Sequence, residues 1–163
     1  MTRLTWLVGP PGAGKSTFAR RQREFARSVE FPAMLGPLVD QPGIRKGVLT
    51  AHGHLVEAIR AIELHPANAS LGPLLVVAGL VAEECLFPLR PHEQVWLLLP
   101  ERARWAEQLR SRPVGAHCSQ QYDDFDYAAI WYDRFCEWQA RGLPIRQLEV
   151  DFEPGLLGRV EFE

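Results

Sequence analysis

The feature that most constrains this chain is a glycine-rich segment close to its N-terminus. Residues 9–17 read GPPGAGKST, which matches the spacing G-x-x-x-x-G-K-[ST], and we call this segment the glycine loop. An apolar run at 4–8 precedes it, and residues 17–26 follow it with the pattern of an amphipathic helix. A glycine-rich turn between a buried strand and a helix is the context in which this spacing wraps a polyphosphate. The pattern therefore predicts a strand, a phosphate-binding loop and a helix; an ordinary glycine-rich turn is the alternative.

The residue types in the glycine loop suit a nucleoside triphosphate and its magnesium ion. Glycines at 9, 12 and 14 allow backbone conformations that other residues avoid, so successive N–H groups can face phosphate oxygens. Lys15 can reach the β- and γ-phosphates, and the Ser16 hydroxyl is placed to bind Mg²⁺. ATP and Mg²⁺ are thus the predicted cofactors. The predicted nucleotide-binding residues are Gly9, Pro10, Pro11, Gly12, Ala13, Gly14, Lys15, Ser16 and Thr17.

Composition favours a single domain with a small-molecule partner. The chain has 163 residues, 47% of them hydrophobic, and 18 basic against 20 acidic residues give a net charge of −2. A chain of this size can form one core, and this one has no overall basic field to hold nucleic acid. The first apolar run begins at residue 4, so we expect no signal peptide, and we expect no membrane span because no run of about 18 apolar residues occurs. We expect one domain over 1–163 in a cytoplasmic protein without a membrane partner.

Apolar runs of strand length alternate with stretches of helical period. The runs lie at 4–8, 33–39, 74–80, 95–99 and, more weakly, 145–150. The first helical stripe comprises Val48, Ala51, Leu55, Ile59 and Ile62. A second helix is expected to begin at Pro100 and Glu101 and to end before Pro113. A last helix carries Ala128, Trp131, Phe135 and Trp138 on one side. This alternation predicts an α/β fold in which a parallel sheet is covered by helices on both faces.

Residues 113–124 interrupt this regular pattern, and they directly follow the helix that carries several arginines. Loops of this length in compact domains are usually functional lids or connectors. We interpret the region around 101–126 as an arginine-bearing lid.

The order of these elements resembles the P-loop kinase superfamily, which includes nucleoside-monophosphate, shikimate, gluconate and polynucleotide 5′-hydroxyl kinases. The glycine loop is the specific motif; over the rest of the chain the likeness is in the order of elements. The resemblance implies a three-layer P-loop NTPase fold with a five-stranded parallel sheet in the order 2-3-1-4-5. It also implies an ATP-dependent phosphotransferase that moves the γ-phosphate to a hydroxyl or phosphate group of a small molecule.

Members of this superfamily usually carry an acid at the end of the second strand, often followed by an arginine. Here the run 33–39 leads into Asp40, and Arg45 follows. A carboxylate at that place can accept the proton of the attacking hydroxyl or hold the hydroxyl in line with the γ-phosphate, and Arg45 would hold an anionic group of the acceptor. The simpler interpretation of residues 40–43 is a surface turn, where aspartate, proline and glycine are common.

Four arginines, Arg102, Arg104, Arg110 and Arg112, lie on or beside the helix before the expected lid. Arginines delivered by a closing lid can stabilise the negative charge of phosphoryl transfer, and Arg110 and Arg112 are the catalytic candidates. Ordinary charges on a solvated helix face are the alternative. The predicted catalytic residues are Lys15, Asp40, Arg45, Arg110 and Arg112. The predicted metal-binding residues are Ser16 and Asp40.

The chain departs from its relatives at the end of the third strand, where Gly79 stands in place of the aspartate that many P-loop proteins use for the magnesium shell. Asp40 could serve the metal through water, or Glu83 or Glu84 could turn back to it. A site that binds nucleotide but turns over poorly is the third possibility.

Two further groups have simple structural interpretations. His52 and His54 are two apart on one helix and point in nearly opposite directions, so they cannot chelate one metal. The stripe of Trp131, Phe135 and Trp138 is typical of a core-facing helix rather than a surface on which bases stack.

Two other functions stay open beside the small-molecule kinase. A nucleotide-binding regulatory ATPase or switch is one, although the chain has no N-K-x-D tetrad and no acidic pair directly after the third strand. A polynucleotide 5′-hydroxyl kinase is the other, and the negative net charge makes it the weaker hypothesis.

Overall fold

A computed structural model describes residues 1–30, 42–111 and 125–148 of this chain. These residues form a five-stranded sheet in the order β2-β3-β1-β4-β5, and every neighbouring pair is parallel. The strands are β1 (Leu4–Val8), β2 (Arg27–Glu30), β3 (Leu74–Gly79), β4 (Glu93–Leu98) and β5 (Arg146–Leu148). The predicted sheet and its strand order are confirmed.

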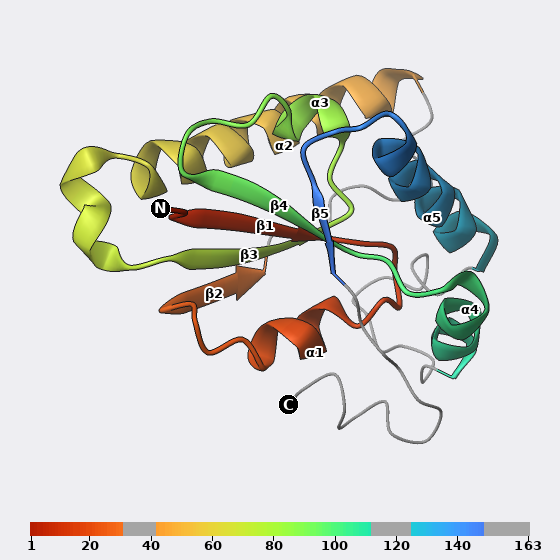
Figure 1. Cartoon of the computed structure of the whole chain (residues 1–163). Helices are drawn as coiled ribbons and strands as arrows, with labels where there is room; N and C mark the ends of the chain where they lie inside the picture. Colours follow the sequence, from red (N-terminus) through yellow and green to blue (C-terminus); the bar gives the residue numbers. More distant parts are fainter. Residues whose placement is uncertain (31–41, 112–124, 149–163) are drawn as a thin grey trace.

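Helices cover both faces of the sheet (Figure 1). They are α1 (Lys15–Arg20), α2 (Pro42–Glu63), α3 (Glu83–Leu86), α4 (Arg102–Arg110) and α5 (Phe125–Ala140), with a 3-10 turn at Pro66–Leu71. α2 and α3 lie over one face and α1 lies over the other, while α4 and α5 stand near the carboxyl ends of the strands (Figure 1). Within the described residues, the layers are those that the alternating sequence pattern predicts.

Alternate residues of the central strands build two separate cores. Trp6 and Val76 pack with α2, α3, α4 and α5, while Leu7 and Leu75 pack with Ala19 of α1 on the other face. All five residues of β1 are buried. A strand covered on both faces is apolar at nearly every position, which explains the run at 4–8. Its one polar residue, Thr5, accepts a hydrogen bond of 2.9 Å from the Gln94 side chain.

The second strand is the main correction to the sequence-based prediction. It was expected at 33–39, a segment that lies outside the described residues, but β2 is formed by Arg27–Glu30. β2 is an edge strand, and its Val29 side chain is 45% exposed. An edge strand with little burial needs no apolar run, so hydrophobicity alone does not find it.

The first helix is shorter than the pattern at 17–26 predicts, since α1 ends at Arg20. Phe18 and Phe25 nevertheless both pack edge-on against Trp96 of β4, with ring centroids 6.4 and 5.4 Å away. Their spacing therefore reflects two contacts with one tryptophan, made by a helix and by the segment after it.

The later helices follow their predicted stripes with one exception. Ala128, Trp131, Phe135 and Trp138 of α5 are all buried, as expected for a core-facing helix. The exception is α2: Leu55 and Ile59 of the predicted stripe are only partly buried against the core, and Ile62 is 56% exposed. The apolar residue of α2 that is fully buried is Val56, which the predicted stripe does not include. Helix α4 begins after Glu101, whose carboxylate accepts hydrogen bonds from the N–H groups of Ala103 and Arg104.

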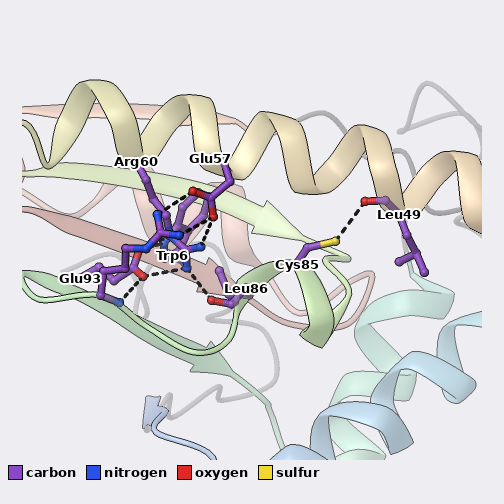
Figure 2. Close-up of polar contacts among 8 residues, drawn as sticks. Trp6, Leu49, Glu57, Arg60, Cys85, Leu86 and Glu93 are labelled. Atoms are coloured by element: carbon purple, nitrogen blue, oxygen red, sulfur yellow. Dashed lines mark hydrogen bonds and ion pairs between the residues drawn. The ribbon is translucent and has the colours of Figure 1, made fainter.

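A buried polar network fastens α2 to the amino end of the sheet (Figure 2). Arg60 of α2 forms an ion pair with Glu93 of β4, with Nη2 2.7 Å from Oε1. The same carboxylate accepts a hydrogen bond of 2.9 Å from the indole N–H of Trp6, and Arg60 also donates to the Leu86 carbonyl. The network thus joins α2, β1, β4 and the end of α3.

None of the helices in residues 1–30, 42–111 and 125–148 is both long enough and apolar enough to span a membrane.

Candidate nucleotide-binding site

The glycine loop turns between β1 and α1 at the carboxyl end of the sheet. Its backbone closes on itself, because the N–H of Ala13 donates to the Pro10 carbonyl at 3.2 Å. Gly14 then leads into α1 in the left-handed conformation, with φ 91° and ψ 22°. In open α/β sheets this edge is where ligands bind.

The loop starts in close contact with the neighbouring strand. A Cβ atom on Gly9 would lie 2.5 Å from the carbonyl oxygen of Leu98, at the end of β4. Because that oxygen belongs to the backbone of the sheet, it cannot move aside. Gly9 is therefore required by the approach of two strand ends.

Lys15 folds back over the glycine loop. Its Nζ atom donates to the carbonyl oxygens of Gly9 and Pro10, at 2.8 Å in each case. The ammonium group is thus held beside the start of the loop by backbone acceptors. Two neutral acceptors can be exchanged for a phosphate oxygen without leaving a buried charge unpaired.

The hydroxyl of Ser16 donates a hydrogen bond of 2.6 Å to Oε1 of Glu30. Glu30 is the last residue of β2, so the parallel sheet brings its carboxylate to the same edge as the glycine loop. The sequence pattern does not single out this residue, because it predicts the second strand at 33–39 and β2 lies at Arg27–Glu30. The sequence signal was weak: an acid at the end of a four-residue, mostly polar stretch.

Gly79 ends β3 directly beside Lys15. A Cβ atom on Gly79 would lie 3.4 Å from Cε of Lys15, and the backbone there has φ 61°. The position at which many P-loop proteins carry an aspartate is therefore next to the loop lysine, and here it offers no side chain.

Comparison with solved structures finds kinases with this architecture. A sugar kinase from Janibacter sp. HTCC2649, solved unliganded, aligns over 96% of this chain and 90% of its own, with TM-score 0.57 and 17% identity. A shikimate kinase from Acinetobacter baumannii, solved in complex with shikimate, aligns over 98% of this chain and 88% of its own, with TM-score 0.52 and 16% identity. The chain has the P-loop kinase fold. No protein-family model matches its sequence, and no curated protein does either.

Glu83 and Glu84 are the two acids that could replace the aspartate absent at position 79. In the structure, Glu83 has another partner. Its carboxylate forms an ion pair with Arg141, which follows α5, with one N–O contact of 2.8 Å. The hydrogen bond from Arg141 lowers the pKa of Glu83, so the carboxylate stays ionised in this pair. Glu84 is exposed.

The predicted catalytic residues are described to different extents. Asp40 and Arg112 lie outside the described residues, as does the expected lid segment at 113–124. Arg45 lies within α2, but its side chain is not among those described. Arg110 is the exposed last residue of α4. The roles assigned to these residues remain predictions.

One of the four arginines around α4 has a structural role. Arg102 forms an ion pair with Asp133 of α5 at 2.6 Å, and its guanidinium lies 5.1 Å from the ring centroid of Tyr132. The pair raises the pKa of Arg102. Arg102 thus ties α4 to α5.

The two histidines of α2 lie in opposite environments, as their spacing predicts. His52 is fully buried, and this burial lowers its pKa below the usual histidine range. His54, two residues later, is exposed.

Proposed function

We propose that this chain is an ATP-dependent phosphotransferase that moves the γ-phosphate of ATP to a hydroxyl or phosphate group of a small molecule. The observation that carries the proposal is the arrangement of Lys15, Ser16 and Glu30 around the glycine loop. Lys15 is held beside the loop by its carbonyl oxygens, and Ser16 is bonded to Glu30 at the same edge of the sheet. A phosphate-binding cation and a metal-binding hydroxyl with a neighbouring carboxylate are what nucleotide–magnesium binding needs.

The residues present fit Mg²⁺ bound with a nucleotide. Magnesium prefers oxygen ligands and keeps several waters, and when bound it neutralises charge on the β- and γ-phosphates. Ser16 would contribute its hydroxyl to the ion. Glu30 is the acid at the end of the second strand, and we assign to it the supporting carboxylate, because its oxygen already lies 2.6 Å from the Ser16 hydroxyl.

The other proposed residues act on the transferred group and its acceptor. Because β2 ends at Glu30, Asp40 is not the acid that ends this strand. We retain for Asp40 the proposed role of accepting the proton of the attacking hydroxyl, and for Arg45 that of holding an anionic group of the acceptor. Arg110 and Arg112 would stabilise the charge that develops on the transferred oxygens. Lys15 would leave the carbonyl oxygens of Gly9 and Pro10 and bind the β- and γ-phosphates.

A small hydroxylated acceptor is favoured over a nucleic acid. The net charge of −2 provides no general attraction for phosphate backbones. Two proteins with the same fold are described as a sugar kinase and as a shikimate kinase in complex with shikimate. We therefore place sugars and shikimate first among candidate acceptors.

The glycine at the end of β3 favours a second candidate, a nucleotide-binding regulatory ATPase. Gly79 offers no carboxylate beside Lys15, and Glu83 is paired with Arg141. A site supported by fewer acids could bind nucleotide and turn over slowly, with a protein contact as its output.

The test is ADP release from ATP and Mg²⁺ in the presence of sugars, shikimate, nucleosides, nucleotides, antibiotics or 5′-hydroxyl oligonucleotides. Lys15→Ala is the control for release that does not depend on the site. Acceptor-dependent release that Lys15→Ala abolishes supports the kinase, and Glu30→Gln should then raise the Mg²⁺ concentration needed for half-maximal rate. Release that no acceptor increases favours the regulatory ATPase. If calorimetry detects no binding of ATP, ADP or GTP with Mg²⁺, both candidates are wrong.

A further inference from the structure

Helix α4 contacts the glycine loop at two adjacent backbone positions. The indole N–H of Trp105, a fully buried residue, donates a hydrogen bond of 2.7 Å to the carbonyl oxygen of Pro11. One turn later, Leu109 lies against Gly12. A Cβ atom on Gly12 would be 2.9 Å from Cδ1 and 3.3 Å from Cα of Leu109. A side chain at position 12 would therefore meet the helix itself.

The hydrogen bond to Pro11 also orients the next amide. The Pro11 carbonyl and the Gly12 N–H belong to the same planar peptide unit, and in a trans peptide the two groups point in opposite directions. With the carbonyl fixed toward α4, the N–H of Gly12 must point away from α4. Gly12 can adopt this orientation because it has φ 80°, a conformation that other residues rarely take.

Helix α4 is itself held in place by α5. The hydroxyl of Tyr132 donates a hydrogen bond of 2.6 Å to the Pro100 carbonyl, just before α4. The rings of Trp105 and Tyr132 pack with their centroids 4.6 Å apart, and Arg102 pairs with Asp133. Trp105 therefore connects the glycine loop to two helices that are also joined to each other.

We propose that Trp105 is a positioning residue for the glycine loop: through Pro11 it holds the Gly12 amide turned toward the bound phosphates. This inference rests on the proposed nucleotide-binding function. It goes beyond that function in making phosphate affinity depend on a helix outside the motif. Pre-orienting an amide removes part of the ordering cost that a ligand would otherwise meet on binding.

The chain offers a matched control for the loss of a buried indole hydrogen bond. Trp131 of α5 is also buried, and its N–H donates at 2.9 Å to the hydroxyl of Tyr127. Trp105→Phe and Trp131→Phe therefore each remove one buried N–H and retain an aromatic ring. Only the first removes a contact to the glycine loop.

Calorimetric titration with ADP and Mg²⁺ should separate the two variants. We expect both to unfold at similarly lowered temperatures, and only Trp105→Phe to bind ADP about tenfold more weakly, as fits the loss of one hydrogen bond. Equal affinity of the two variants, within twofold, would overturn the inference. If the wild-type protein binds no ADP, the proposed function has failed instead.

Discussion

The two ends of the sheet hold their polar groups in opposite ways. At the amino end, the Arg60 and Glu93 side chains are 4% and 0% exposed, and their ion pair has a Trp6 hydrogen bond on the same carboxylate (Figure 2). At the carboxyl end, Lys15 and Ser16 are half-buried, and they bond to backbone carbonyl oxygens and to the exposed Glu30. The first arrangement cannot exchange partners without stranding a buried charge, whereas the second can.

Under the proposed function, this difference separates the residues that stabilise the fold from those that bind the ligand. Breaking a buried ion pair costs about 3–5 kcal/mol, because the remaining charge has no partner and no water. An exposed hydrogen bond contributes only about 0.5–1.5 kcal/mol, since water replaces the lost partner. Mutations at the amino end should therefore change unfolding, and mutations at the carboxyl end should change ligand binding.

The largest expected effect is at the amino end. Glu93→Gln should lower the free energy of unfolding in urea by about 3 kcal/mol or more, because Arg60 keeps its charge and loses its buried partner. Glu57→Gln is the matched control: Glu57 also pairs with Arg60, but its side chain is 51% exposed. The control should cost less than about 1 kcal/mol. Similar losses of unfolding free energy in the two variants would contradict the expectation that the buried ion pair contributes more to stability than the exposed one.

Lys15→Ala should weaken ATP binding strongly and change the free energy of unfolding little. Loss of a charged hydrogen-bond donor to phosphate should weaken ATP binding by about 2–3 kcal/mol, or roughly 30- to 150-fold, measured by calorimetry with Mg²⁺. Its free energy of unfolding should change by less than about 1 kcal/mol, because the Gly9 and Pro10 carbonyls that it leaves can bond to water. A large loss of stability with unchanged affinity would contradict the functional assignment of this end.

Gly12 of the glycine loop and Gly53 of α2 should respond in opposite ways when each is replaced by alanine. Gly12→Ala should destabilise the protein by about 1–2 kcal/mol, because φ is 80° and α4 leaves no room for a Cβ. Gly53→Ala on α2 should stabilise it by about 0.5–1 kcal/mol, since nothing lies within 4 Å of that Cβ and alanine favours helix. Thermal unfolding of both variants measures the pair. A stabilised Gly12→Ala would mean that the loop does not need its left-handed residue.

The smallest expected effect is the pH dependence of stability that arises from His52 of α2. Burial lowers the pKa of His52, so below about pH 6.5 the unfolded chain takes up a proton that the folded protein resists. Stability should therefore fall as pH decreases below that value, by at most about 1.4 kcal/mol per pH unit. His52→Gln should flatten this slope in urea unfolding between pH 7 and 5, and the exposed His54→Gln should not. Identical slopes in the three proteins would rule out His52 as the source.

Sequence reasoning succeeded where a pattern lies within one segment. The apolar run at 4–8 is β1, the run at 74–80 contains β3, and the stripe from Ala128 to Trp138 is the buried face of α5. It failed at β2, because an edge strand with exposed residues carries no hydrophobic signature. For the same reason the sequence does not single out Glu30. Its carboxylate meets Ser16 of the glycine loop only because β2 ends at this edge of the sheet.

The sequence by itself determined the strand, the glycine loop and the start of α1, because these depend on residues adjacent along the chain and on the backbone freedom of glycine. Only the tertiary structure decided that Ser16 meets Glu30, that Arg60 meets Glu93, and that Trp105 reaches Pro11 across 94 positions of sequence. Such contacts follow from strand order and helix packing. No local spacing records them, because the partners approach only when the sheet is assembled.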